Sequence, residues 1–285
     1  MKSKISTILL IFVFILGLSL VLYPSLSDYW NTLHASRSVS KYVQEVSNLD
    51  KEEYNEILLQ AIKYNFELPN RNNSFALSEK QKEEYENLLN VGGNGIMGYI
   101  EIPDIDVELP IYHGVEERVM QVAAGHLEWS SLPVGGESAH CVISGHRGLP
   151  SAKLFTNLDK LTEGDTFYIK VLDETLTYRV DRILIVEPKE TKDLLIENGK
   201  DYCTLVTCTP YGINTHRLLV RGERVKNNEL TGEARVTADA YRIETLIVAP
   251  ILAVIFFAVT IPLILIRDRI NKLKYKKNLK NKEIC

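Results

Sequence analysis

The sequence predicts a mainly β protein, a closed β-barrel or sandwich preceded by a helical arm and flanked by two apolar segments. Residues 97–225 consist of short apolar runs between Gly, Pro and Asp turns, which is the pattern of closely spaced strands. Residues 36–90 instead carry apolar residues three and four positions apart, as amphipathic helices do. Long apolar stretches stand near both ends of the 285-residue chain.

The two apolar stretches predict attachment to a membrane. Residues 5–26 follow a short basic head and form either an uncleaved anchor, which we favour, or a cleavable signal peptide, because "PSLS" offers small residues after the apolar run. Leu246 to Ile266 carry no charge and match the roughly 20 residues that a bilayer core requires. Pro250 and Pro262 lie inside this second stretch and are tolerated in membrane helices.

Charge predicts the orientation of these segments. The tail from Arg267 to Cys285 has eight Lys/Arg against two acids, and the head adds Lys2 and Lys4. Removing these eight net positive charges from the whole-chain value of −4 leaves −12 for residues 5–266. Positively charged flanks stay in the cytoplasm, so we expect a cell-membrane protein with both termini inside and the acidic domain outside. The acidic domain also argues against nucleic-acid binding.

The helical arm has two start signals. Asp50 stands before "KEEYNEILLQAIKYNFEL" as a candidate N-cap, and Ser78 with Gln81 fits a capping box. A polar loop, "PNRNNSFAL", separates the two helical segments, and "VGGNG" ends the second one. The strand-like runs that follow are "GYIEI", "ELPIY", "HCVIS", "DTFYIKVL", "LTYRVDRILIVEP", "CTLVT" and "RLLVRGERV".

One cysteine has the surroundings of a nucleophile. Cys208 stands at the end of an apolar run, just before Thr209 and Pro210, so its sulfur is expected at the end of a strand. Arg217 follows nine residues later, after a "PYGIN" turn, and a hairpin would return its guanidinium to the cysteine. His146 ends another apolar run. A thiolate, a proton carrier and a cation for the developing oxyanion are what nucleophilic acyl transfer needs.

These residues resemble a known family. "TLVTCTPYGINTHRLLVRG" is similar to the TLxTC…R signature of sortases, the membrane-anchored cysteine transpeptidases of Gram-positive bacteria. "GYIEIPDIDVELPIYHG", "GHLEWSSLPVGG" and "SGHRGLPSAKLFTNLDKLTEGDTFYI" resemble the class C, pilin-polymerising branch in particular. The resemblance covers roughly residues 85–225 and implies a closed sortase β-barrel of about eight strands. It places the catalytic residues of the family on His146, Cys208 and Arg217.

The resemblance also implies a reaction. The substrate would be an LPXTG-like sorting signal, cleaved between Thr and Gly through a thioester on Cys208. The acceptor would be a lysine amine of a pilin subunit, as in pilus assembly. Three alternatives stay open: a sortase that anchors surface proteins to peptidoglycan, a cysteine peptidase that only hydrolyses, and a non-enzymatic adhesion or scaffold module at the membrane.

The predicted domain organisation follows from these features. The segments are 1–27, an N-terminal anchor or signal peptide; 28–92, a helical arm and candidate lid; 93–226, the sortase catalytic barrel; 227–244, a linker; 245–266, a transmembrane helix; and 267–285, a basic cytoplasmic tail.

The arm departs from the class C pattern. Class C sortases commonly carry a lid with an Asp-Pro-aromatic triplet, whereas "PNRNNSFALSEK" has Phe75 without Asp-Pro before it. Phe75 is therefore a candidate lid residue that lacks the usual locking contact. We expect small thiol reagents to reach Cys208 without any lid mutation. Slow labelling that Phe75→Ala sharply accelerates would contradict this expectation.

The remaining cysteines and histidines are assigned no catalytic role. Cys141 and Cys203 lie inside apolar runs and are expected as buried thiols, or as a disulfide if their strands pair. Cys285 lies in the tail. Four other histidines are expected as surface or hydrogen-bonded framework residues: His113, His126, His140 and His216. No HExxH, paired CxxC or EF-hand spacing is present, so we predict neither a metal nor a cofactor.

Overall fold

The computed structural model describes residues 2–68 and 77–227, together with scattered helical residues between 256 and 270. The chain divides into two compact units, of which the larger, Ser27–Arg235, contains the arm and the β-domain. The smaller unit comprises Met1–Leu26 and Val236–Cys285. The predicted C-terminal membrane segment and basic tail, like Cys285, lie almost wholly outside the described residues.

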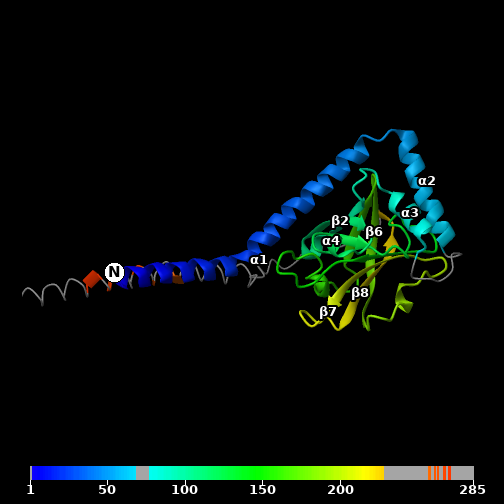
Figure 1. Ribbon diagram of the computed structural model, residues 1–285. Coiled ribbons are helices and arrows are strands. Elements are labelled where there is room, and N and C mark those ends of the chain that lie inside the picture. Colours follow the sequence, from blue (N-terminus) through cyan, green and yellow to red (C-terminus); the bar gives the residue numbers. More distant parts are fainter. Residues whose placement is uncertain are drawn as a thin grey trace, which may run out of the picture. The chain divides into compact units, whose positions relative to one another are not determined.

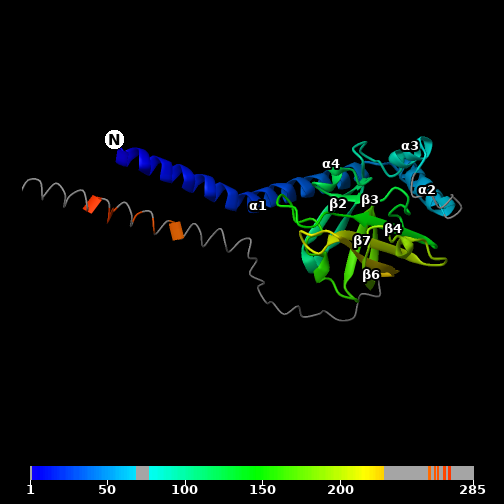
Figure 2. The same cartoon turned by 60° about the horizontal axis from the view of Figure 1, so that its bottom comes forward.

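The β-domain is a closed barrel with the strand order β1-β2-β3-β4-β7-β8-β6-β5 (Figures 1 and 2). Most neighbours are antiparallel, but β2 with β3 and β4 with β7 are parallel. The strands are β1 (Ile96–Ile102), β2 (Val107–His113), β3 (Ala124–His126), β4 (Ala139–Ser144), β5 (Thr166–Val171), β6 (Glu174–Val186), β7 (Asp201–Thr209) and β8 (His216–Val225).

The predicted barrel is confirmed, and each of the seven strand-like runs coincides with a strand to within a few residues. The strand without a predicted counterpart is β3. It has three residues, all of them buried, which is too short for an alternation of apolar and polar residues to be recognised. Closing the barrel leaves none of the β1–β8 ladder as an open edge.

Four α-helices precede or interrupt the strands in the described part of the chain. They are α1 (Lys2–Ser47), α2 (Lys51–Glu67), α3 (Glu79–Asn87) and α4 (Glu117–Met120), with short 3₁₀ turns at Pro103–Ile105, Leu158–Lys160 and Lys192–Leu194. Asp50 caps α2 as predicted, since its Oδ1 accepts from the backbone N–H groups of Glu52 at 2.8 Å and Glu53 at 2.9 Å. The Ser78 N–H donates to Gln81 Oε1 at 2.9 Å at the start of α3.

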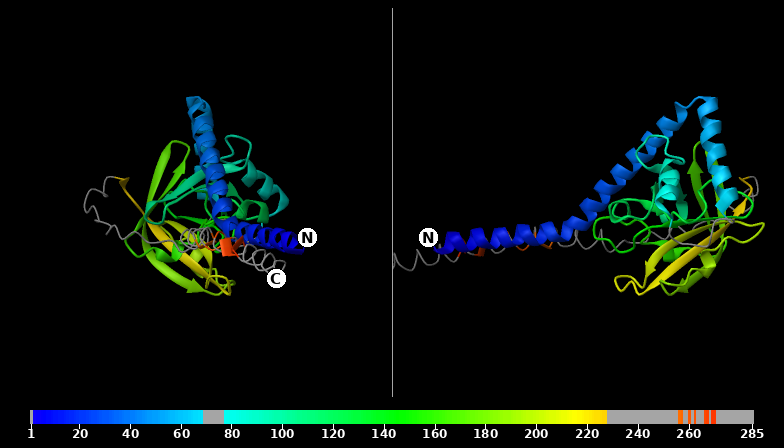
Figure 3. Two further views of the ribbon diagram at one scale, coloured as in Figure 1. Left: turned by 90° about the vertical axis from the view of Figure 1, so that its left-hand side faces the viewer. Right: turned by 45° about the vertical axis from the view of Figure 1, so that its right-hand side comes forward.

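The helical arm is part of the barrel's packing. Within the larger unit, the end of α1 and the whole of α2 form the two sides of a V beside the barrel (Figures 1 and 3). Tyr42 of α1 is fully buried; its hydroxyl donates to the Met97 carbonyl at 3.0 Å and accepts from the Leu172 N–H at 2.7 Å. Asn65 of α2 exchanges two hydrogen bonds with the backbone of Leu132. The arm is therefore fixed to the barrel through both α1 and α2.

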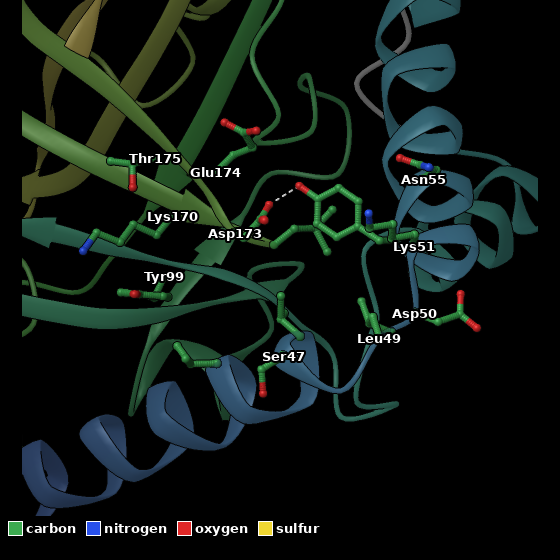
Figure 4. A pocket seen from close by; sticks show the side chains of 14 residues that line it. Ser47, Leu49, Asp50, Lys51, Asn55, Tyr99, Lys170, Asp173, Glu174 and Thr175 are labelled. Atoms are coloured by element: carbon green, nitrogen blue, oxygen red, sulfur yellow. Dashed lines mark hydrogen bonds between the residues drawn. The ribbon is translucent and has the colours of Figure 1, made fainter. Parts of the chain in front are cut away.

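A pocket of about 700 Å³ lies where the bend between α1 and α2 faces the β5–β6 turn (Figure 4). Tyr54 of α2 closes one side of it by donating a hydrogen bond to Asp173 of the turn. Lys170, Glu174 and Thr175 of the hairpin line the other side. This contact is a third link between the arm and the barrel.

The N-terminal part of α1 carries the first predicted membrane segment. Among the described residues, α1 is the helix long and apolar enough to cross a membrane, by its length and composition. Large apolar side chains of this part are exposed, as lipid contact requires. The large exposed side chains include Leu9, Leu10, Phe12, Val13, Ile15, Leu16 and Leu20.

Candidate active site

Cys208 and Arg217 face each other across two strands. Cys208 is the penultimate residue of β7, and the antiparallel register pairs it directly with Arg217 of β8. Side chains of directly opposed residues point to the same side of a sheet, with Cβ atoms about 5 Å apart. The Arg217 guanidinium donates to the carbonyls of His216 at 3.1 Å and Asn214 at 3.4 Å. The hairpin return predicted from the sequence is therefore confirmed.

His146 comes to the same end of the sheet along a different strand. It follows β4, which runs parallel to β7 with Ser144 opposite Val206. The ladder continues past the strand end, because the Gly145 N–H donates to the Val206 carbonyl at 3.0 Å and the Thr207 hydroxyl to the Gly145 carbonyl at 2.7 Å. This register brings His146 level with Cys208. The three candidate residues are thus assembled by β4, β7 and β8, and all three are half-buried.

The face of the sheet that carries Cys208 continues as an apolar strip. Its buried members are Val142, Val186, Leu194, Val206 and Leu219. Val206 precedes Cys208 by two residues and lies opposite Leu219, so both side chains are on the cysteine's face. Leu127, Trp129 and Leu184 pack against the strip and are half-buried. The candidate site therefore lies at one end of an apolar strip on the same face of the sheet.

A polar cluster anchors the far end of the same face. Arg221 of β8 is 6% exposed; it makes two bonds to Asp181, at 3.1 and 2.6 Å, and one to Glu197 at 3.0 Å. Its guanidinium lies 4.0 Å from the Tyr202 ring centroid. His140 binds the Leu195 carbonyl through Nδ1 at 2.8 Å, and burial lowers the pKa of its imidazole. Arg221 and His140 together fasten the β6–β7 connection to the sheet.

The four histidines without an assigned role are surface or hydrogen-bonded framework residues, as expected. His126 is completely buried and contacts the Tyr85 hydroxyl at 2.9 Å and the Ser131 carbonyl at 2.8 Å. Both ring nitrogens of His113 contact backbone carbonyls, and burial lowers its pKa. His216 is exposed and pairs with Thr209, one position away from the Cys208–Arg217 pair.

The two buried cysteines lie side by side. Cys141 and Cys203 are direct partners in the β4–β7 ladder, and both are free thiols with almost no exposure. Burial raises the pKa of the Cys203 thiol well above its ordinary value, which makes that thiol a poor nucleophile. Among the three cysteines that the structure describes, Cys208 is the one that solvent reaches, since it is half-buried.

The chain is similar to several solved sortases. The sortase C1 structure from Streptococcus agalactiae is 49% identical, with a TM-score of 0.66, covering 67% of this chain and 99% of that one. A sortase C of Streptococcus pneumoniae is 47% identical, with a TM-score of 0.61 and coverage of 67% and 97%. A Clostridium perfringens sortase C with the C-terminal cell wall sorting motif is 44% identical, with a TM-score of 0.60 and coverage of 67% and 100%.

A family model for the sortase domain matches residues 100–225, a range that contains His146, Cys208 and Arg217. The chain belongs to the sortase family. Sortase A of Staphylococcus aureus is 31% identical over 142 residues, which are 48% of this chain and 67% of that protein. Sortase D of Bacillus subtilis is 30% identical over 131 residues, 45% of this chain and 63% of that protein. The family and the fold expected from the sequence motifs are both confirmed.

In this sortase, Arg147 is a further candidate site residue, which its sequence motif did not single out. It follows His146 directly, and its side chain is only 9% exposed. Its guanidinium donates to Thr209 Oγ1 at 3.3 Å and to Asp159, and lies 5.8 Å from the Tyr211 ring centroid. Arg147 therefore joins the segment that bears His146 to the residue after Cys208. Its position next to His146 in the sequence could have marked Arg147 as a candidate. Its contacts with Thr209 and Asp159 are seen only in the folded chain.

We expect Arg147→Lys to lower kcat about tenfold while KM for the sorting peptide changes much less, because displacing catalytic groups by ~1 Å can cost up to about 10²-fold in rate. Lysine keeps the charge but lacks the planar fork that reaches two partners. Steady-state cleavage of a fluorogenic sorting peptide measures both constants. Arg182→Lys is the matched control, because Arg182 is 47% exposed and pairs with Asp193 at 3.6 Å. Equal kcat values for the two variants would contradict a positioning role.

The candidate lid residue falls in a segment that the structure does not describe. Phe75 lies in 69–76, outside the described residues. The segments on either side are held to the barrel, by Asn65 near the end of α2 and by Tyr85 of α3, whose hydroxyl accepts from the Gly114 N–H at 3.0 Å.

Proposed function

We propose that this sortase cleaves an LPXTG-like sorting signal between Thr and Gly and transfers the acyl group to a lysine amine of a pilin subunit. The observation that supports this most directly is the cross-strand pair of Cys208 and Arg217, placed level with His146 by the parallel β4–β7 ladder. The high identity to sortase C structures favours the pilin-polymerising branch over the wall-anchoring one.

In the first half-reaction, the Cys208 thiolate attacks the threonine carbonyl carbon. Arg217 donates to the carbonyl oxygen as it becomes an oxyanion, which is the role that preorganised donors fill in acyl transfer. The C–N bond to glycine then breaks, and the imidazolium of His146 protonates the departing amine. The products are a thioester on Cys208 and a free glycine amine, and His146 is left neutral.

In the second half-reaction, a lysine side chain of the acceptor replaces the glycine. The lysine ammonium first releases one proton to solvent, and its neutral amine then attacks the thioester carbonyl carbon. The C–S bond breaks, the sulfur leaves as a thiolate, and the second proton passes from the nitrogen to His146. An isopeptide bond is formed, and the starting thiolate–imidazolium pair is restored.

The proposed location is the outer face of the cell membrane. The apolar part of α1 is long enough to anchor the chain, and the basic residues at both ends of the sequence favour cytoplasmic termini. The partners are then LPXTG-bearing secreted proteins on the donor side and a pilin lysine on the acceptor side. This mechanism requires no metal or other cofactor.

Intact-mass spectrometry of the full chain in detergent micelles, incubated with an LPXTG-type peptide, tests the proposal. We expect a covalent adduct on Cys208 that a lysine-bearing peptide resolves into an isopeptide-linked product. An adduct that resolves only to free acid, even with saturating lysine peptide, would instead identify a hydrolytic peptidase. Preferential transfer to a peptidoglycan-type amine would identify a wall-anchoring sortase. Absence of any adduct would contradict the substrate class.

A further inference from the structure

We propose that Glu117 recognises the ammonium group of the acceptor lysine, and that the pocket beside α4 receives the acceptor chain around that lysine. This inference rests on the proposed transpeptidation and assigns the second substrate to a definite side of the site.

Glu117 is held beside the candidate general base without being bound to it. Its Oε1 accepts a hydrogen bond from Gln121, which fixes the carboxylate plane. Its Oε2 lies 4.0 Å from His146 Nε2, which is longer than a hydrogen bond. An ammonium has three donors, so a lysine in this gap can bind the carboxylate while its nitrogen remains within reach of the imidazole.

The exposure of Glu117 argues against a purely structural role. Its side chain is 75% exposed, whereas the His146 side chain is 30% exposed. Val119 and Met120 of the same short helix are buried, so the backbone of α4 is anchored while the Glu117 carboxylate faces solvent. A carboxylate at such a position is available to an incoming ligand.

A pocket of about 830 Å³ lies next to α4 and offers room for a peptide. Its walls come from α3, β2, α4 and the β3–β4 connection, and include Tyr112, Val119, Leu127 and Trp129. Leu127 and Trp129 also pack against the apolar strip on the Cys208 face. The pocket and the active-site face therefore share two side chains. Glu116 and Arg118 line the pocket, whereas Glu117, between them in the chain, faces His146.

The ion pairs around α4 favour Glu117 over Glu116 as the carboxylate that binds a cation. The neighbouring carboxylate, Glu116, already pairs with Arg118 at 2.8 Å and with Lys82 at 3.9 Å. Glu117 instead directs its second oxygen toward His146. An acceptor chain in the pocket would extend its lysine side chain past α4 to this carboxylate, next to the base that must accept the lysine proton.

The chemistry predicts an effect on acceptor binding rather than on the covalent step. An exposed ion pair contributes only modestly to binding, so Glu117→Gln should raise KM for a lysine peptide about fivefold. The amine must be neutral when it attacks, so the carboxylate does not assist bond formation, and kcat for transfer should stay within about twofold. The ratio of isopeptide product to hydrolysed peptide, at a fixed subsaturating lysine concentration, should fall correspondingly.

The experiment uses the full chain in detergent micelles, a saturating sorting peptide and two acceptors. One acceptor is a lysine-bearing peptide, and the other is hydroxylamine, which is uncharged at neutral pH and needs no carboxylate to bind. Glu117→Gln is compared with wild type and with Glu163→Gln, which removes an exposed carboxylate from the turn before β5. We expect the loss with lysine peptide only, in Glu117→Gln only, and partial recovery in Glu117→Asp.

Each other outcome decides against the proposal. An unchanged KM for lysine peptide in Glu117→Gln would remove the recognition role. An equal loss with lysine peptide and hydroxylamine would show that Glu117 acts by orienting His146. A wild-type enzyme that forms the thioester but no isopeptide product would overturn the proposed lysine transfer itself, and this inference with it. The wild-type reaction therefore separates failure of the proposed function from failure of the inference.

Discussion

Cys208→Ala is expected to lower isopeptide formation by about 10⁴-fold or more, which is the scale seen when an enzyme loses its nucleophile. Both half-reactions pass through the thioester, so no other residue can supply the missing bond. Adduct formation and product release are both read by mass spectrometry. We expect neither from Cys208→Ala, and an unchanged thermal unfolding midpoint, because Cys208 is at a strand end and only half-buried.

The matched control for this prediction is another cysteine of the same barrel. Cys141→Ala removes a free thiol that is 2% exposed and lies on the strand leading to His146. It should retain the adduct on Cys208 and most of the activity, and it should lose some stability because a buried sulfur leaves a small cavity. If the adduct survives in Cys208→Ala, or is lost in Cys141→Ala, the nucleophile is not Cys208.

The site was predictable from the sequence to the extent that its contacts are local. Cys208 and Arg217 are separated by a single turn, and a tight return between two apolar runs can pair them in few ways. The alignment of His146 with Cys208 depends on the parallel β4–β7 pairing, across more than fifty residues, which no local spacing reveals. The family motifs, rather than periodicity, supplied that part of the prediction.

Residues whose roles depend on distant partners could not be found in this way. Arg147 is recognisable only when Thr209 and Asp159 are brought to it. Glu117 stands 29 positions before His146 in the chain, on a helix of four residues that is too short for any periodic signal. The same limit explains the missed strand β3, because its pairing with β2 and β4 comes from tertiary packing rather than from propensity.

Arg221→Ala is the substitution for which we expect the largest loss of stability. Arg221 is 6% exposed and is the common partner of Asp181 and Glu197. Removing one member of a buried ion pair costs about 3–5 kcal/mol, because the remaining charges lose their partner. Asp181 and Glu197 keep some solvent contact, at 26% and 55% exposure, so we expect the lower value, about 3 kcal/mol. For a domain of this size that corresponds to a fall of roughly 6–12 °C in Tm.

Arg182→Ala is the control for this substitution. Arg182 faces Arg221 across the β6–β8 ladder, but it is 47% exposed and contacts Asp193 at 3.6 Å, so its removal should cost less than about 1 kcal/mol. Thermal unfolding of the two variants, followed by circular dichroism, distinguishes them; equal Tm values would show that the Arg221 cluster does not stabilise the barrel.

The same substitution should also weaken binding of the sorting peptide. Glu197 belongs to the β6–β7 connection, whose Leu194 packs on the apolar strip beside the active site. Releasing Glu197 should loosen this connection and raise KM for the sorting peptide, whereas hydroxylamine resolution of a preformed thioester should be unaffected. Arg221→Lys retains the charge without the two-pronged contact to Asp181, so its Tm should lie between those of wild type and Arg221→Ala. If KM stays at the wild-type value while Tm falls, Arg221 contributes to stability alone, and the β6–β7 connection does not take part in binding the sorting peptide.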